Sequence, residues 1–193
     1  MNKVLRVATI GMTALTLAGA NSAAAADKAG SYAVHGLGAE SCKVLQYPDF
    51  NKNPQNRAAF VSWLMGYISG VNAFLSGVFD GTIVQEPAAV AAMVATVCAK
   101  NPEIKIDSAA ASVFKYMSPV ASRTASGIVT FKNGNYTVSL REDVVQKLQL
   151  KLVEVAKYKG STDGKASPAF TEALKAYQKD KKITETGVPD VST

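Results

Sequence analysis

The sequence contains little of what enzymes and metal proteins use for chemistry: 193 residues include one histidine, two cysteines and one tryptophan. Zinc sites need more ligands than Cys42, Cys98 and His35 supply. General acid–base and nucleophilic catalysis need a positioned histidine, carboxylate or thiolate partner, and the only histidine lies in a glycine-rich segment. We therefore predict that the protein is not an enzyme and holds no metal or cofactor.

Charge of one sign is not gathered on any segment. The formal net charge is +6, but the lysines are scattered among acidic residues. Nucleic-acid binding needs a basic stripe, usually with interleaved aromatic side chains. The sequence therefore predicts no nucleic-acid partner.

Long apolar runs are few, and the first lies at the N-terminus. It follows Lys3 and Arg6 and is followed by small residues that end at Ala26. The run is shorter than the roughly 20 residues of a membrane span. This order of charges, apolar run and small residues is typical of a secretory signal peptide cleaved after Ala26. We expect residues 1–26 to be removed and the product to be periplasmic or secreted.

Export would place Cys42 and Cys98 in an oxidising compartment. We predict that they form one disulfide, with two buried free thiols as the less favoured alternative. Closing the long loop between them would stabilise the fold by roughly 4 kcal/mol on a chain-entropy estimate.

The second apolar run spans residues 58–79 and carries no charge. Its length fits a membrane span, but recurring polar residues and three glycines argue against one. A span would also place the two cysteines on opposite sides of the bilayer. We favour a long helix of an exported domain, capped by Asn53 and opened by Pro54.

Apolar side chains recur along that run at helical spacing and predict one broad buried face. The members of this face are Phe60, Leu64, Tyr67, Val71, Phe74, Leu75 and Val78. Gly66 and Gly70 predict a narrow groove where a second helix approaches closely. We expect residues 86–100 to form that helix and residues 107–117 to form a third.

These residues resemble the HdeA-like superfamily, in particular the Rap/Tai type of periplasmic immunity proteins. The resemblance covers residues 36–117 and rests on Gly38, Cys42, Trp63, Gly66, Gly70, Val71, Asn72, Cys98, Asn101 and Pro102. It implies a small disulfide-bonded helical domain that binds another protein and associates with itself. For Trp63 we favour a packing role over a role in anchoring a partner.

Residues 118–139 are predicted to link this domain to the C-terminal part. Alternating apolar residues around Asn133 and Gly134 predict a short β-hairpin within the linker.

A helix-turn-helix pattern occupies most of the C-terminal part. A first helix is expected over residues 141–158. Gly160, Asp163 and Gly164 then predict a turn, and Ser167 with Pro168 starts a second helix. Two such short apolar stripes make a small core, so this unit needs neighbours.

Residues 140–193 resemble the peptidoglycan-binding-like domain of cell-wall proteins. The matching residues are Val145, Leu148, Gln149, Leu152, Tyr158, Gly160, Asp163, Gly164, Ala173, Leu174, Tyr177, Gln178, Thr186, Gly187 and Asp190. The family usually has glycine at Ser167, threonine at Phe170 and a closing helix that the resemblance does not cover here. Peptidoglycan is the partner that the resemblance implies.

Glycan strands offer hydroxyl and amide groups beside apolar sugar faces, so their site needs an aromatic surface with fixed donors and acceptors. Tyr158, Asp163 and Gln178 are the candidates, and Lys159 or Lys165 could meet stem-peptide carboxylates. The alternative, which we favour residue by residue, is that the tyrosines pack in the core and Asp163 holds the turn.

The sequence thus predicts an all-α protein: a disulfide-clamped helical domain over residues 27–117, a linker with a hairpin, and a peptidoglycan-binding-like module over residues 140–193. We expect the first domain to bind a periplasmic protein partner, as an immunity factor or inhibitor does, and the second to direct it to the cell wall. Two alternatives are an acid-stress holdase and a structural wall protein that forms homo-oligomers.

Overall fold

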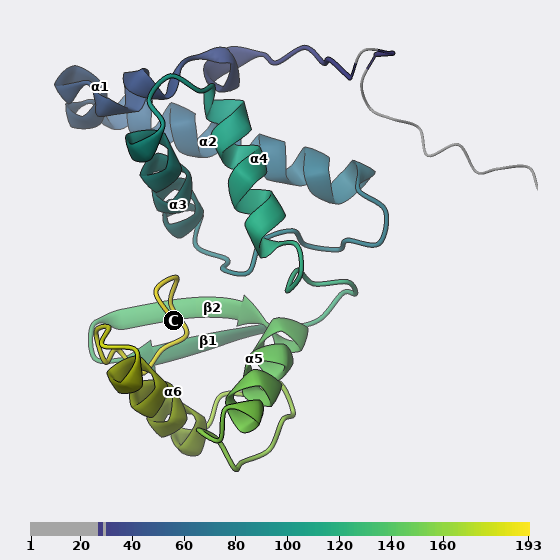
Figure 1. The fold of residues 1–193 in the computed structure, drawn as a ribbon, viewed down its shortest axis with the longest axis vertical. Helices are drawn as coiled ribbons and strands as arrows, with labels where there is room; N and C mark the ends of the chain where they lie inside the picture. The colour runs from purple at the N-terminus through teal and green to yellow at the C-terminus, as the bar shows by residue number, and fades with distance from the viewer. Residues whose placement is uncertain (1–26, 29) are drawn as a thin grey trace, which may run out of the picture. The chain divides into compact units, whose positions relative to one another are not determined.

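The computed structural model describes residues 27–28 and 30–193, so the predicted signal peptide lies outside the described residues. The chain divides into two units, Met1–Ala33 and Val34–Thr193. In the first unit, the N–H of Gly30 donates to the carbonyl of Asp27 in a turn. The second unit holds the helices and strands (Figure 1).

The first part of the second unit is helical. Its elements are the 3-10 helices η1 (Gly36–Ala39) and η2 (Cys42–Gln46) and the α-helices α1 (Pro48–Lys52), α2 (Pro54–Phe74), α3 (Pro87–Lys100) and α4 (Ile106–Met117). The Asn53 side chain accepts a hydrogen bond from the N–H of Gln55, and Pro54 follows it at the first helical position. The predicted start of the long helix is therefore confirmed.

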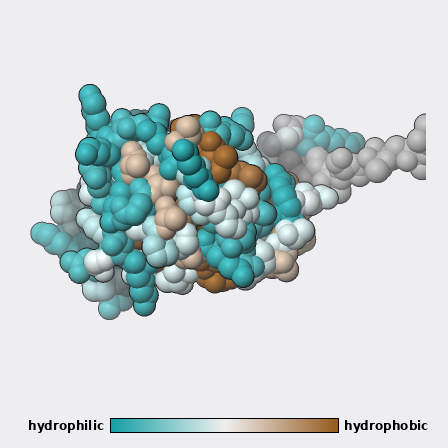
Figure 2. Space-filling view, turned by 90° about the horizontal axis from the view of Figure 1, so that it is seen from below, coloured by the Kyte–Doolittle hydropathy of each residue, from teal (hydrophilic) through white to brown (hydrophobic). Residues whose placement is uncertain are grey.

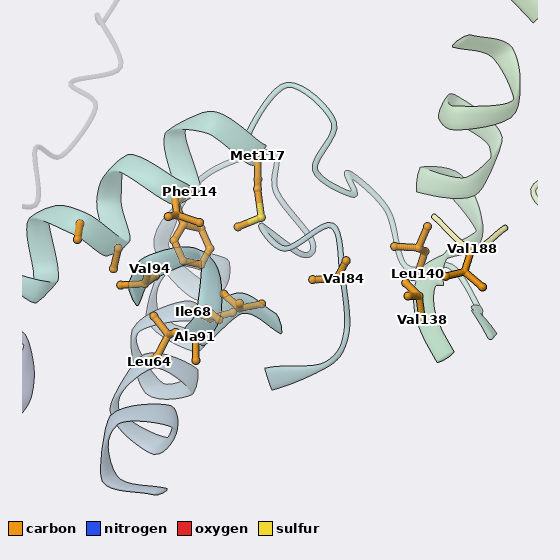
Figure 3. Packing of buried hydrophobic residues seen from close by; sticks show 14 of the residues in the cluster. Leu64, Ile68, Val84, Ala91, Val94, Phe114, Met117, Val138, Leu140 and Val188 are labelled. Carbon is orange, nitrogen blue, oxygen red and sulfur yellow. The ribbon is translucent and has the colours of Figure 1, made fainter. Parts of the chain in front are cut away.

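The core of this part lies where α2, α3 and α4 meet. Figure 3 shows Leu64 and Ile68 of α2 converging with Val94 of α3 and Phe114 of α4. Burying one such side chain contributes about 1.5–3 kcal/mol. Cys42 of η2 and Cys98 of α3 are fully buried and form the predicted disulfide.

Trp63 holds the beginning of the unit onto α2. Its indole N–H donates to the carbonyl of His35 at 2.9 Å. A Cβ at Gly38 would lie 1.9 Å from the indole ring, so only glycine fits there. This geometry is the packing role that the sequence favours for Trp63.

The close helix contact predicted at Gly66 and Gly70 is wrong. A Cβ at either glycine would meet no atom within 4 Å. The reason is helical geometry: at about 100° per residue, Gly66 lies on the opposite side of α2 from Leu64, which faces the core. The glycines belong to an open face.

The predicted apolar face of α2 is correct for its first turns and wrong at its end. Phe60 and Leu64 are buried, but the helix ends at Phe74, whose side chain is 88% exposed. Asn72 ties the chain beyond the helix back to it, because its side-chain oxygen accepts from the N–H of Gly81 at 2.8 Å.

The β-hairpin is confirmed. Strands β1 (Ile128–Asn133) and β2 (Tyr136–Arg141) pair antiparallel, with Phe131 opposite Val138. Gly134 has a φ of 56° in the connecting turn, a conformation that glycine adopts without strain.

The hairpin packs with the C-terminal helices rather than standing apart as a linker. Helices α5 (Glu142–Glu154) and α6 (Pro168–Asp180) follow it, and Ser167 caps α6 as predicted. The rings of Phe131 and Phe170 lie 5.7 Å apart. Figure 3 shows Val138 and Leu140 of β2 beside Val188 near the chain end. We call this assembly, residues 128–193, the C-terminal module.

The described residues are mostly helical, with six α-helices and one two-stranded sheet. The sheet departs from a strictly all-α fold, and its apolar side chains are part of the C-terminal core. Among residues 27–28 and 30–193, no helix is both long and apolar enough to cross a membrane.

Candidate functional site

Two buried glutamines organise the loops of the C-terminal module. On α5, the side-chain oxygen of Gln149 accepts from the N–H of Gly164 at 2.8 Å, and its amide donates to the carbonyl of Lys165 at 2.9 Å. Gly164 has a φ of 77°, and a Cβ there would lie 2.6 Å from the carbonyl oxygen of Glu142. The glutamine and the glycine together fix the loop that leads to α6.

Gln178 makes the same arrangement from α6. Its oxygen accepts from the N–H of Gly187 at 2.8 Å, and its amide donates to the carbonyl of Val188 at 3.0 Å. Gly187 has a φ of 66°. In both cases the glutamine bonds the N–H of a left-handed glycine and the carbonyl of the next residue, so the same hydrogen-bond arrangement holds both loops.

Gln178 is therefore committed to the fold. The side chain is fully buried, and its amide also donates to the hydroxyls of Thr186 and Thr193. The sequence places Gln178 among the wall-contacting candidates, but in this structure its polar atoms face inward.

Tyr158 is also mostly buried, at 4% exposure. Its ring lies 5.4 Å from that of Phe170, and its hydroxyl donates to the carbonyl of Ser161 at 2.8 Å. A Cβ at Gly160 would lie 2.4 Å from the Tyr158 hydroxyl, which explains the glycine. Tyr158 shapes the turn after α5 and leaves only a small edge for contact.

Asp163 is exposed and holds the turn. Its carboxylate accepts from the N–H of Lys165 at 3.0 Å, and this hydrogen bond lowers the pKa of Asp163. The three predicted site residues thus do not converge: one is exposed at the loop, one lies under the turn and one is inside the core.

A shallow groove of about 490 Å³ lies between the turn after α5 and one face of α6. The turn contributes Ala156, Lys157, Tyr158, Lys159 and Gly160, and α6 contributes Ala169, Glu172, Ala173 and Ala176. Three alanines on α6 present little bulk, so a ligand can come close to the helix. Sequence patterns indicate the tyrosine and the lysine here but miss this alanine stripe.

Some charged side chains of the groove form ion pairs and one does not. Lys157 forms an ion pair with Asp180, and Glu172 pairs with Lys175 at 2.9 Å. Lys159 is exposed, and no acidic side chain within residues 27–28 and 30–193 forms an ion pair with it. The groove therefore offers an apolar floor beside one cation available for an anionic group.

Hydrophobic surface is limited on one face of the protein. Figure 2, seen from below the view of Figure 1, shows mostly hydrophilic residues with small hydrophobic areas.

Comparison with known protein families gives a match in the C-terminal part of the chain. Residues 141–193 match the sequence model of a family described as "Putative peptidoglycan binding domain". The match begins at the end of β2 and does not reach the disulfide-bonded helices. No curated protein and no solved structure matches the chain.

Proposed function

We propose that this protein is an exported, non-enzymatic protein that binds peptidoglycan through the groove between the turn after α5 and helix α6. The observation that carries the proposal is the coincidence of the family match with a groove that pairs an apolar floor with the unpaired cation of Lys159. Stem peptides of peptidoglycan carry carboxylates, and sugar rings offer apolar faces, so both features have a counterpart.

Lys159 is the residue that contacts the stem-peptide carboxylate in this proposal. Lys159 is exposed and lines the groove together with Gly160. An exposed charge contact is weak, so we expect modest affinity that falls as salt is added. Asp163 and Lys165 lie on the loop that Gln149 holds, and they contribute only if the ligand extends beyond the groove.

The test is co-sedimentation of the full chain with purified insoluble peptidoglycan at low and high salt. We expect Lys159→Glu to release the protein into the supernatant at low salt. Lys132→Glu is the matched control, because Lys132 is exposed on β1 and outside the groove but changes charge equally. Equal sedimentation of the two variants would refute the groove, and absence of the wild type from the pellet would refute wall binding.

We further propose that the helical part, residues 34–117, binds a periplasmic protein partner, with the C-terminal module keeping it at the wall. The supporting observation is the exposure of large apolar side chains at the end of α2, where Phe74 is 88% and Leu75 is 50% exposed. Monomeric proteins seldom leave such groups together on their surface.

A further inference from the structure

A second groove, of about 310 Å³, is formed by the helical part and the residues that follow it, and it is distinct from the groove beside α6 that we propose for peptidoglycan. Its lining is mainly apolar and comes from α2, the segment after it, α4 and the segment after that helix. The apolar members are Val71, Leu75, Val78, Phe114, Pro119 and Ala121. We call it the apolar groove.

Exposed apolar side chains neighbour two lining residues of the apolar groove in sequence. Phe74 precedes Leu75 and is 88% exposed, and Val120 follows Pro119 and is 40% exposed. A small molecule would fill the groove and leave these side chains in water. An extended apolar surface of this kind is instead typical of contact with another protein.

The charges at the apolar groove are positive. Among the residues that the structure describes, Lys115 is the one charged residue that lines the groove, and it is exposed. Arg123 adds a second cation nearby, donating to the carbonyls of Gly77 and Ser118 at 3.0 Å each. Asp143 accepts from Ser122 nearby, but it pairs with Lys147, whose ammonium group donates to the carbonyls of Val120 and Ala121. These two charges offset each other, so the charge that Lys115 and Arg123 add is positive.

The positive charge distinguishes between two possible occupants of the apolar groove, a second copy of this chain and a different protein. In a symmetric dimer the same patch meets itself, which would bring Lys115 and Arg123 toward their own copies. Like charges across an interface oppose association. A partner with acidic side chains beside its apolar residues gains from the same cations.

We propose that the apolar groove binds an apolar segment of another protein, with acidic residues of that segment meeting Lys115 and Arg123. This inference rests on the proposed protein-binding role of residues 34–117 and is independent of wall binding. It names the surface and the chemistry of the partner: apolar anchors for the groove and carboxylates for its edge.

The experiment uses the full chain and two fluorescein-labelled synthetic helical peptides, read by fluorescence anisotropy. Both peptides carry leucines at positions i, i+3, i+4 and i+7; one has glutamates beside the leucines and the other has lysines. We expect the glutamate peptide to bind about tenfold more tightly than the lysine peptide, and Lys115→Glu to remove or reverse this preference.

The variant Leu75→Asp tests the apolar contact. Leu75 is half-exposed, so the change is tolerated by the fold, and it places a charge inside the groove. Val153→Asp on α5 is the matched control, since Val153 is 43% exposed and outside the groove. We expect Leu75→Asp to abolish binding of the glutamate peptide and Val153→Asp to leave it unchanged.

Three outcomes would overturn the proposal: no saturable binding of the glutamate peptide, equal binding of both peptides, or binding that survives Leu75→Asp. A dimer seen by light scattering and dissolved by Leu75→Asp would also overturn it, since the occupant would then be a second copy. Co-sedimentation of Leu75→Asp with peptidoglycan is expected to equal that of the wild type. A variant that loses only the peptide therefore separates this site from wall binding.

Discussion

Arg141 Nε lies 2.8 Å from Oδ2 of Asp80, which joins the end of β2 to the segment between α2 and α3. Asp80 also accepts from the N–H and hydroxyl of Thr82 and from the side chain of Gln85. The Arg141 guanidinium lies 4.7 Å over the ring of Phe79. The contacts between Arg141 and the segment at Asp80 therefore connect residues that are far apart in the sequence of the second unit.

Removing one partner of this pair should destabilise the protein. The Asp80 side chain is 8% exposed and that of Arg141 is 19% exposed, so Arg141→Leu leaves a mostly buried carboxylate without its cation. We expect a loss of about 3 kcal/mol in the free energy of unfolding, measured by urea denaturation.

Glu103→Ala provides the control for that measurement. Its partner Lys43 lies 2.8 Å away, but both side chains are largely exposed, so we expect no measurable change. If the two variants lose equal stability, the Asp80 pair is no more than a surface contact.

Acid should destabilise the protein through Asp80 and Asp143. Burial favours a raised pKa for both groups, but hydrogen bonds outweigh it: Thr82 and Arg141 lower the pKa of Asp80, and Ser126 and Ser122 lower that of Asp143. Because each pKa lies lower in the folded state than the ordinary 3.8, each carboxylate stabilises the fold above that value. This contribution is lost as the pH falls through the folded-state pKa.

The measurement is the free energy of unfolding as a function of pH for wild type and Asp143→Asn. We expect the variant to be less stable at neutral pH, because the Lys147 ion pair and the ionised acceptor are lost. Below about pH 4 the difference between the two proteins should shrink. A difference that stays constant from neutral to acidic pH would show that ionisation of Asp143 does not stabilise the fold.

Two glycines should respond to alanine in opposite directions. Gly38→Ala drives a methyl group into the Trp63 ring, 1.9 Å away, and should cost about 1–3 kcal/mol. Gly66→Ala lies within α2 with no atom in reach of the new Cβ, and should stabilise by about 0.5–1 kcal/mol through helix propensity. Thermal unfolding measures both changes in stability. If Gly66→Ala destabilises the protein, another helix packs closely against Gly66, contrary to the structure.

Local chemistry predicts the start of several elements. Asn53 with Pro54 opens α2, Ser167 with Pro168 opens α6, and the turn at Gly134 closes the hairpin. Helix caps and turns depend on a few residues that are neighbours in sequence, so they can be predicted from the sequence alone.

Long-range packing is where sequence patterns are insufficient. Glycines spaced along one side of a helix are compatible with a close helix contact and with an open face. The packing of α3 against Leu64 and Ile68 leaves Gly66 and Gly70 on the open face. The hairpin fits a linker in sequence, but Phe131 meets Phe170 in the C-terminal core.

The candidate site shows the same limit. Tyrosine and glutamine beside a turn fit a carbohydrate site, yet Gln178 is oriented by a glycine nine residues further on. Gln149 bonds a glycine 15 residues further on and Gln178 one nine residues further on, so no fixed spacing in the sequence links each glutamine to its glycine.

The role of Gln178 gives the last prediction. Gln178→Ala removes the acceptor for the N–H of buried Gly187, whereas the carbonyl of Val188 keeps the hydroxyl of Thr186 as a donor. We expect a loss of about 1–3 kcal/mol per group left unpaired, seen as a lower melting temperature. Peptidoglycan co-sedimentation, measured where circular dichroism shows the variant folded, should equal that of wild type.

The matched control is Lys159→Glu, which should behave in the reverse way, with an unchanged melting temperature and weaker sedimentation, because Lys159 is exposed. The two variants thus separate what holds the module together from what meets the wall. A folded Gln178→Ala that no longer sediments would mean that the ligand reaches the loop at Gly187. The site would then lie at that loop and not in the groove beside Lys159.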